Sequence, residues 1–408
     1  MTHQHRLATT WVDGAAGSLY DVDNLPYGVF SRDAENARVG VRIGEFVLDL
    51  APVAAADMLS VGHLFEAPEL NAFLATGRDT WDSVRGWIQG LLTDEGERDI
   101  VEPSLVPLEQ VTLALPVAIG DYVDFYSSLD HASNVGKILR PDAEPLLPNW
   151  RHLPVGYHGR AGTVVASGTG VRRPCGQSKA AEASVPTYGP SRRLDIEAEL
   201  GFVVGAPSRL GERVPTAAFA DHVFGVVGLN DWSARDIQAW EYVPLGPFLG
   251  KSFATSIATW VTPLAALEAA RVDLPVQEPT PLGYLQVGGP AGYDIAVAVE
   301  VNGEVVSRPP YRSMYWGPAQ MLAHMTVNGA SVRTGDLFAS GTISGPTRAE
   351  RGSFLELSWG GTEPWTAAGH ERSFLLDGDE VVLRLTAPGE FARIGLGEVR
   401  GTVVRART

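Results

Sequence analysis

Alternating hydrophobic and polar positions predict short strands near the start of the chain. Residues 39–50 (VGVRIGEFVLDL) alternate on both sides of Gly44 and Glu45, which is typical of a β-hairpin with its turn at that pair. From about Met58 to Leu92, apolar residues instead recur at three- and four-residue steps, which predicts helix. We therefore expect short strands and one or two helices in this part.

Strand and turn patterns dominate the chain after about residue 121. Residues 297–306 alternate around Asn302-Gly303, a pair that favours the tight turn of a hairpin. Residues 374–385 repeat this pattern around Asp377-Gly378. Many short strands with few long helices indicate a rolled or barrel-like sheet, because the segment is too large for a small sandwich.

The length of the chain predicts two domains. A chain of 408 residues is long for one hydrophobic core. The sequence pattern changes at Leu115-Pro116, so we place the domains at residues 1–116 and 117–408. The expected fold class is mainly β with some α.

Composition and charge narrow the choice of partners. The net charge of −16, from 32 basic and 48 acidic residues, argues against nucleic acid or an anionic membrane as partner. It does not exclude an acidic small molecule, since a local basic cluster can override the net charge. No apolar run is long enough for a transmembrane helix, and residues 1–6 lack the apolar run of a signal peptide. The single cysteine, Cys175, rules out an internal disulfide and fits a cytoplasmic protein.

Paired glutamates give the sharpest chemical pattern. In residues 195–204 (DIEAELGFVV), Glu197 and Glu199 are two apart and share a strand face, about 6.6–7 Å from each other. On a solvated face this costs little, whereas in a cleft two carboxylates repel and require a cation. Oxygen ligands alone suit Ca²⁺ or Mg²⁺. Asp124 and Asp231 are candidate partners, although each could instead be a helix N-cap.

A histidine follows the first of these aspartates. Ser127 and Asp130 resemble a capping box, which would place His131 in the first turns of a helix. A histidine there could act as a general base, or it could be a buried side chain bonded to backbone.

A second group of polar residues follows Asp231. Arg235 and Gln238 are three apart on a predicted helix and share a face, and Lys251 comes soon after. Such a cluster could bind an anion or a developing oxyanion, or it could be a solvated helix face. The glycine-rich residues 339–345 have neither Walker nor Rossmann spacing, so nucleotide binding is not expected.

Together these segments resemble the fumarylacetoacetase family. The resemblance extends over most of residues 119–408 and is weaker at residues 25–31. The matching runs are residues 124–128 (DFYSS), 147–150 (LPNW), 153–160 (LPVGYHGR), 230–236 (NDWSARD), 240–252 (WEYVPLGPFLGKS), 339–345 (ASGTISG) and 355–359 (LELSW).

The resemblance implies an architecture and two metal sites. It implies an N-terminal SH3-like β domain, a C-terminal β-roll or barrel domain of the family's own type, and a homodimer. A catalytic Ca²⁺ would be held by four carboxylates, those of Asp124, Glu197, Glu199 and Asp231. A second, structural Mg²⁺ would lie near Lys251 and Thr255, with the backbone carbonyl of Lys251 as the expected ligand, because a protonated amine has no lone pair to donate.

The resemblance also implies residue roles. His131 would be the general base, oriented by Glu356, and an oxyanion hole would consist of Arg235, Gln238 and Lys251. The substrate would be contacted by Tyr126, Arg140, Tyr157, Gln238, Tyr242 and Thr342. One departure is Leu129-Asp130, where the animal enzymes carry longer polar residues. The Asp130 carboxylate could raise the pKa of His131 if it points inward, or it could face solvent.

The implied activity is hydrolysis of a carbon–carbon bond in fumarylacetoacetate, a small diketo acid, to fumarate and acetoacetate, the last step of tyrosine and phenylalanine degradation. One alternative is a related enzyme on the same scaffold: an acylpyruvate hydrolase, an oxaloacetate decarboxylase or a hydratase. Those relatives are usually shorter, so His131, Glu356 and the full segment 1–116 favour fumarylacetoacetate. Another alternative is a metal-stabilised binding protein without activity, although all the expected catalytic residues are present.

Overall fold

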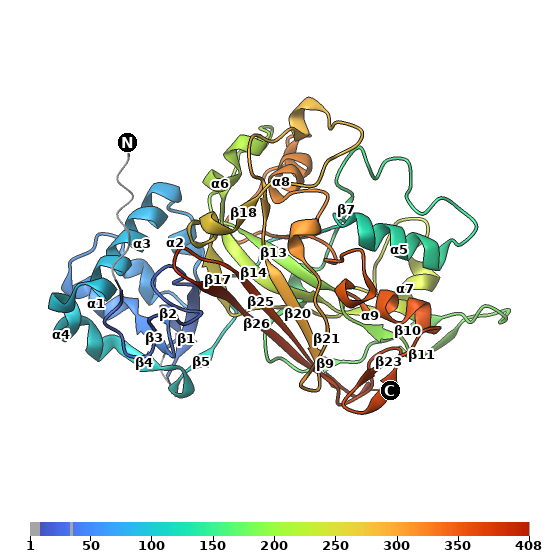
Figure 1. Ribbon diagram of the computed structural model, residues 1–408, viewed down its shortest axis with the longest axis horizontal. Helices are drawn as coiled ribbons and strands as arrows, with labels where there is room; N and C mark the ends of the chain where they lie inside the picture. Colours follow the sequence, from blue (N-terminus) through green and yellow to red (C-terminus); the bar gives the residue numbers. More distant parts are fainter. Residues whose placement is uncertain (1–8, 33–35, 408) are drawn as a thin grey trace.

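The structure is a computed structural model that describes residues 9–32 and 36–407. An N-terminal part lies at one end of the molecule, at the left of Figure 1, and a larger β-rich part forms the rest. Residues 1–6, where no signal peptide is expected, lie outside the described residues. Within the described ranges, no helix is long and apolar enough to cross a membrane.

The N-terminal part contains the hairpin predicted at Gly44-Glu45. Arg42 pairs with Val47 and Ile43 with Phe46, which confirms the register. The strands here are β1 (Tyr27–Ser31), β2 (Arg38–Ile43), β3 (Phe46–Asp49), β4 (Leu105–Pro107) and β5 (Thr112–Leu113). The α-helices are α1 (Leu50–Ala56), α2 (Asn71–Leu74), α3 (Arg78–Thr93) and α4 (Arg98–Val101).

The helix predicted from Met58 to Leu92 is correct only in its second half. Helix α3 buries Trp81, Val84 and Ile88 on one face, as the spacing predicts. The first half is broken into short turns. Gly77 has a φ of +88° and Met58 a φ of +50°, and neither value is compatible with a continuing right-handed helix. Periodicity in apolar residues could not reveal these two backbone positions.

The two parts share one hydrogen-bonded sheet. Its main path runs in the order β4-β3-β2-β1-β17-β14-β13-β22-β6-β7, so the N-terminal strands continue directly into the larger part. The junction is antiparallel, with Tyr27 opposite Val261 and Gly28 opposite Trp260. The strands of the larger part are β6 (Tyr122–Phe125), β7 (Gly156–His158), β13 (Ala198–Val204), β14 (Val223–Asp231), β16 (Thr255–Ile257), β17 (Trp260–Pro263) and β22 (Leu337–Ala339).

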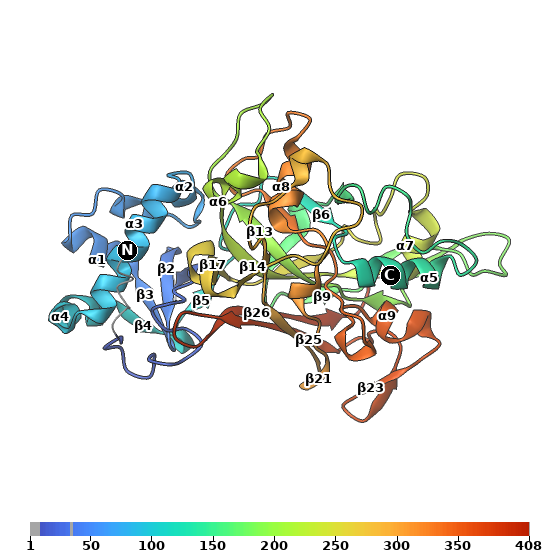
Figure 2. The ribbon, with the colours of Figure 1, turned by 45° about the horizontal axis from the view of Figure 1, so that its top comes forward.

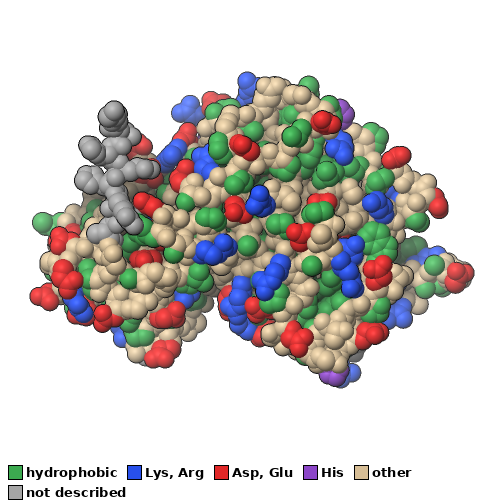
Figure 3. Space-filling view, in the orientation of Figure 1, with side chains coloured by type: hydrophobic (Ala, Val, Ile, Leu, Met, Phe, Trp, Pro, Cys, Tyr) green, Lys and Arg blue, Asp and Glu red, His purple; other side chains and the backbone are tan. Residues whose placement is uncertain are grey.

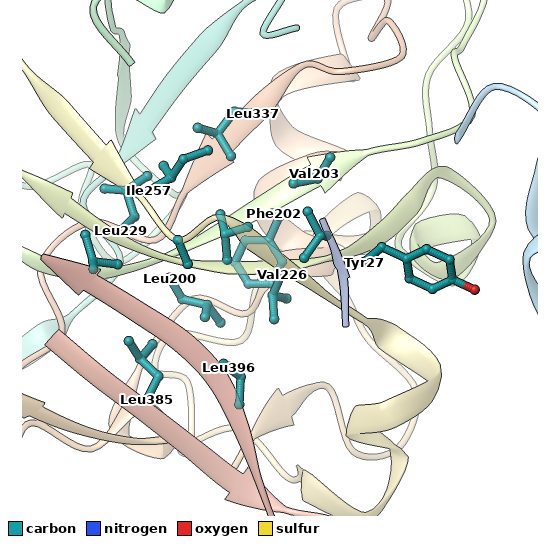
Figure 4. Close-up of a cluster of buried hydrophobic side chains, with 14 of the residues drawn as sticks. Tyr27, Leu200, Phe202, Val203, Val226, Leu229, Ile257, Leu337, Leu385 and Leu396 are labelled. Atoms are coloured by element: carbon teal, nitrogen blue, oxygen red, sulfur yellow. The ribbon is translucent and has the colours of Figure 1, made fainter. Parts of the chain in front are cut away.

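A second sheet packs against the first and encloses the core. It has the order β21-β20-β25-β26-β9. Its strands are β9 (Val171–Arg172), β20 (Ala296–Val301), β21 (Glu304–Ser307), β25 (Glu380–Pro388) and β26 (Arg393–Val404). Leu200 and Leu229 of the first sheet face Leu385 and Leu396 of the second in Figure 4, and all four are buried. The approach is close, because a Cβ on Gly228 would meet Leu385 at 2.7 Å.

One of the two later hairpin predictions is confirmed and the other is wrong. Asn302 and Gly303 join β20 to β21, and both have positive φ, as a tight hairpin turn requires. No hairpin forms at Asp377-Gly378. The Gly378 N–H donates to the Val403 carbonyl, and Leu375 pairs with Leu194 instead of with β25. The turn forms, but the segment before it is not a strand, and its single bridge goes to Leu194, which is distant in sequence.

Three helices gather at the end of the larger part that is farthest from the N-terminal strands. They are α5 (Leu129–Leu139), α7 (Arg235–Glu241) and α9 (Phe354–Leu357), and both ribbon views place them together (Figures 1 and 2). Acidic and basic side chains are interspersed over the face in Figure 3, without a broad basic surface there. The predicted class, mainly β with some α, is confirmed.

Candidate active site

Adjacent strands bring four acidic side chains to one edge of the large sheet. Asp124 is on β6, Glu199 near the start of β13 and Asp231 at the end of β14. Glu197 precedes β13, after β12 (Leu194–Asp195), so the expected strand 195–204 is interrupted at residues 196–197. One oxygen from each of the four carboxylates lies within 4.8 Å of the others. The four carboxylates that the sequence predicts as metal ligands therefore lie together.

Burial excludes the interpretation that the paired glutamates lie on a solvated face. Glu197 is 5% exposed and Glu199 is 0% exposed. Both oxygens of Glu199 and Oδ1 of Asp124 are buried with no hydrogen-bond partner among the described residues. Orphaned carboxylate oxygens are costly, and a divalent cation with oxygen ligands would satisfy them. The residues present fit such an ion.

The electrostatics of the cluster also fit a cation. Burial raises the pKa of Glu199, Asp124 and Asp231, and the neighbouring carboxylates raise it further. Burial alone would also raise the pKa of Glu197, but Lys251 and Arg235 lower it below its ordinary value. The chain itself therefore neutralises Glu197 but leaves the other three carboxylates without full charge compensation.

His131 lies in the first turn of α5, as predicted, and is 2% exposed. Its Nδ1–H donates to Oε2 of Glu356 at 2.6 Å. In the neutral imidazole, that bond leaves Nε2 without a proton, and this is the tautomer that a general base needs. The helix start differs by one residue from the expected capping box. Ser128, not Ser127, is the N-cap and accepts the His131 N–H.

Among the described residues, Asp130 makes no hydrogen bond to this pair. The carboxyl group of Asp130 is partly exposed at the start of α5. Partial burial raises its pKa, and the charge of Glu356 raises it further. The departure from the family pattern therefore places a second acid near Glu356.

Three further side chains hold Glu356, and sequence reasoning missed them. Oε2 accepts hydrogen bonds from the hydroxyls of Ser344 (2.9 Å) and Ser353 (2.8 Å), and Oε1 accepts one from Asn134 (3.0 Å). Burial would raise the pKa of Glu356, but His131 and the hydrogen bonds from Asn134 and Ser353 lower it. Ser344 lies in the loop after β22 and Ser353 is the N-cap of α9, and neither position carries a sequence signal for this role. Asn134 carries a weak one, since it is three residues after His131 on one helix face.

Arg235 and Gln238 share a face of α7, as their spacing predicts. Nη1 of Arg235 donates to Oε1 of Gln238 at 3.2 Å and lies 2.8 Å from Oε1 of Glu197. Nη2 is buried and has no partner among the described residues. Lys251 ion-pairs with Glu197 and with Asp231, the latter at 2.9 Å. The solvated-face alternative for this cluster is therefore wrong.

The residues expected to contact substrate differ in their surroundings. The Tyr157 hydroxyl donates to Asp231 at 3.1 Å, and the Tyr126 ring meets the His131 ring edge-on at 5.2 Å. The hydroxyl of Thr342 is buried and has no hydrogen-bond partner within residues 9–32 and 36–407. Arg140 caps the end of α5 and donates to the Pro145 carbonyl. Tyr242 caps the end of α7 and is partly exposed.

The second metal site has less support. Thr255 pairs with Asp231 in the sheet, and its hydroxyl donates to Oδ1 of Asp231 at 2.8 Å. This contact brings Thr255 and Lys251 to the same carboxylate. No orphaned oxygen of Thr255 comparable to those of Glu199 is found in the described part of the chain. A Mg²⁺ site here stays a prediction.

A cavity of about 280 Å³ opens beside the acidic cluster. It is lined by Tyr157, Asp231 and Lys251, together with Tyr122, His158, Arg160 and Phe248. Neither His131 nor Thr342 is among the described residues that line this cavity. The cavity therefore reaches the carboxylates through Asp231 rather than through the histidine.

Two family models match the chain. The fumarylacetoacetate (FAA) hydrolase C-terminal model matches residues 122–404, and the fumarylacetoacetase N-terminal model matches residues 23–116. The chain is 46% identical to fumarylacetoacetase from Caenorhabditis elegans over 414 residues, covering 97% of this chain and 99% of that protein. It is 45% identical to fumarylacetoacetase from Homo sapiens with the same coverage.

Solved structures agree in fold. A fumarylacetoacetate hydrolase from Exiguobacterium antarcticum aligns with a TM-score of 0.55 at 18% identity, over 94% of this chain and 100% of that one. A maleylpyruvate hydrolase from Sphingobium sp. SYK-6 aligns with a TM-score of 0.52 at the same identity and coverage. At this identity the likeness concerns the fold alone. Because the C-terminal family model extends over more than half of the residues, and because full-length relatives are 45–46% identical, the chain belongs to the fumarylacetoacetate hydrolase family.

Proposed function

We propose that this protein hydrolyses fumarylacetoacetate to fumarate and acetoacetate with the help of a divalent cation. The observation that carries the proposal is the assembly of four buried carboxylates beside a histidine–glutamate pair and an arginine whose buried Nη2 has no partner among the residues that the structure describes. Curated fumarylacetoacetases from animals, plants and a slime mould, 40–46% identical over nearly the whole chain, support the same reaction.

Asp124, Glu197, Glu199 and Asp231 would hold the cation, and we propose Ca²⁺ because all four offer oxygen. When bound, the ion would polarise the diketone oxygens and stabilise the enolate of the leaving group. A second, structural Mg²⁺ near Lys251 and Thr255 is part of the proposal.

His131 acts as the base. With Nδ1–H held by Glu356, the free Nε2 accepts a proton from water, and the resulting hydroxide adds to the ketone carbon beside the fumaryl arm. Glu356, fixed by its hydroxyl and amide donors, stabilises the imidazolium that forms. When the carbon–carbon bond breaks, its electron pair goes to the acetoacetate carbon, and the imidazolium returns the proton there.

The oxyanion forms where donors are already in place. Nη2 of Arg235 has no partner in the described chain and would donate to the new negative oxygen, with Gln238 and Lys251 beside it. Preorganised donors of this kind typically contribute about 10²–10³ in rate each. The substrate would be held by the predicted contacts Tyr126, Arg140, Tyr157, Gln238, Tyr242 and Thr342.

The test is the loss of fumarylacetoacetate absorbance, with fumarate and acetoacetate identified as products. We expect turnover that a chelator removes and Ca²⁺ restores. Acylpyruvates and oxaloacetate, assayed in parallel, should be poor substrates. Preferred turnover of an acylpyruvate would reassign the reaction to a relative on the same scaffold, and no turnover of any of them would favour a binding protein.

Assembly and location complete the proposal. We propose a homodimer that works in the cytoplasm in tyrosine and phenylalanine catabolism, as the resemblance implies. The single Cys175, which is free in the structure, is compatible with a reducing compartment. We also propose domains at residues 1–116 and 117–408. Size-exclusion chromatography with light scattering tests the dimer, since a monomer at micromolar concentration would contradict it.

A further inference from the structure

Asp195 is a fully buried carboxylate that has no role in the mechanism above. It ends β12 and is 0% exposed. Oδ1 accepts the backbone N–H groups of Ile196 (2.8 Å) and Phe354 (2.7 Å). Oδ2 accepts the N–H of Leu355 (2.9 Å) and Nε–H of Arg235 (2.8 Å). Four donors converge on one charge, which is the arrangement that makes a buried carboxylate tolerable.

Two of these donors belong to the helix that carries Glu356. Phe354 and Leu355 are the first two residues of α9, and N–H groups at a helix start have no acceptor within the helix. Glu356 is the next residue. Asp195 thus contacts the turn that carries Glu356, while the Glu356 side chain itself is held separately by Ser344, Ser353 and Asn134.

The fourth donor belongs to the arginine of the expected oxyanion hole. The guanidinium of Arg235 is planar and offers its N–H groups in fixed directions. Asp195 holds Nε, while Glu197 and Gln238 hold Nη1. Only Nη2 is left buried without a partner in the described chain. Because Nε and Nη1 are both held and the guanidinium is planar, the direction of Nη2 is fixed.

We propose that Asp195 is a positioning residue that aims Nη2 of Arg235 at the reacting oxygen and ties that arginine to the helix of Glu356. The inference rests on the proposed function, because it needs an oxyanion for Nη2 to meet. Asp195 acts through Arg235, and it touches neither substrate nor cation. If Asp195 served only to stabilise the fold, its substitution would lower the rate by the same factor whether or not Arg235 is present.

A double-mutant cycle separates the two roles. In Asp195→Asn, the amide NH₂ faces donors, so at least one hydrogen bond to Arg235 or to α9 is lost. We expect kcat to fall by about 10–100-fold with KM changed less than threefold, as for loss of a donor used only in the transition state. In an Arg235→Ala background, the same substitution should change kcat by less than about threefold. Effects that multiply in the double variant would overturn the proposal.

Asp379→Asn is the matched control. Asp379 is also buried (4% exposed) and pairs with Arg372 at 2.9 Å. In the described chain its carboxylate also accepts hydrogen bonds from the Leu376 backbone and from Asn302, and none of these partners is a site residue. It should lower the melting temperature and leave kcat unchanged. A comparable loss of kcat in Asp379→Asn would show that any buried carboxylate produces the effect, and would overturn the proposal.

A second variant keeps the test decisive if Asp195→Asn does not fold. Arg235→Lys keeps the positive charge but loses the fork, so a lysine bound to Asp195 has no second donor in a fixed direction. We expect kcat to fall to within about threefold of the Arg235→Ala value. At least half of wild-type kcat in Arg235→Lys would overturn the proposal. Failure of the proposed function is distinct, because the wild-type protein itself would then not turn over fumarylacetoacetate.

Discussion

At the scale of single residues, Glu199 is the most informative ligand candidate, because both of its oxygens are buried and have no hydrogen-bond partner in the described part of the chain. Glu199→Gln removes one charge and keeps the shape, so Ca²⁺ affinity should fall on the order of 10–100-fold, as losses in metal-site shells do. Isothermal titration calorimetry of the protein freed of metal by a chelator measures the Ca²⁺ affinity. Glu380→Gln, at a half-exposed ion pair with Arg400, is the control. Unchanged affinity in Glu199→Gln would remove Glu199 from the set of ligands.

His131 separates catalysis from metal binding. Its side chain bonds to Glu356 and its backbone N–H to Ser128, so His131→Ala deletes the base while the N-cap of α5 stays. We expect turnover to fall by roughly 10²–10⁴-fold with Ca²⁺ affinity retained. His324→Ala, at a histidine bonded to Tyr284 away from the cluster, should keep full turnover. Near-normal turnover in His131→Ala would contradict its role as base.

Sequence reasoning performs well for residues whose chemistry is local. Arg235 and Gln238 are three apart on α7, so the helical period alone places them on one face. The spacing of Glu197 and Glu199 also suggests one face, although Glu197 precedes β13 instead of lying in it. Sequence reasoning could not find Asp195 or Ser344, whose partners are far along the chain, 40 residues away at Arg235 and 12 at Glu356. It also could not decide between a solvated and a buried face for the glutamates, because burial depends on the strands at either side.

At the scale of elements, the packing of α5 against the following loop depends on one glycine, Gly136. A Cβ on Gly136 would lie 2.0 Å from the Pro145 carbonyl oxygen, which is also the acceptor for Arg140. Gly136→Ala must displace that backbone, so we expect a loss of about 1–3 kcal/mol in the free energy of unfolding. KM should rise as well, because Arg140 loses its acceptor. Urea unfolding and steady-state kinetics measure the two effects.

Gly90 is the matched control for that substitution. It lies in α3, is exposed, and has no atom within 4 Å of an added Cβ. Gly90→Ala should therefore stabilise the protein by about 0.5–1 kcal/mol, from helix propensity alone. A stability loss of the same size in both variants would show that the packing of Gly136 is not the cause.

The elements themselves were predictable to different degrees. Hairpins with local turns, at Gly44-Glu45 and Asn302-Gly303, follow from alternation and turn chemistry. The failure at Asp377-Gly378 has a topological cause. Strand β25 pairs with β20 and with β26, and nothing near residue 377 encodes those distant partners.

At the scale of the whole molecule, the acidic edge is part of a sheet that spans both parts of the chain. β1 pairs with β17, and β17 with β14, which ends in Asp231. Length and composition could suggest two domains, but they could not show that one hydrogen-bonded sheet continues between them. Cation binding at Asp231 should therefore stabilise a structure that includes the N-terminal strands.

The pH dependence of stability tests this linkage. Burial and mutual repulsion raise the pKa of Asp124, Glu199 and Asp231 in the cation-free fold above their ordinary values of 3.8 and 4.5. Between the ordinary and the raised values the native state binds more protons than the unfolded state, so the stability of the cation-free protein falls as pH rises through that window. Ca²⁺ competes with those protons, and its stabilising effect should therefore grow with pH.

Calorimetry of the protein in chelator and in excess Ca²⁺, at about pH 5 and about pH 8, measures that effect. We expect the melting temperature to rise by several degrees more at the higher pH, since about 1 kcal/mol shifts a large domain by roughly 2–4 °C. In Glu199→Gln, the rise in melting temperature caused by Ca²⁺ should be smaller at both pH values, because the substitution removes a metal ligand and also a carboxyl group that competes for protons. A Ca²⁺ increment that is equal at the two pH values, or larger in acid, would mean that the ion does not replace protons on these buried carboxyl groups.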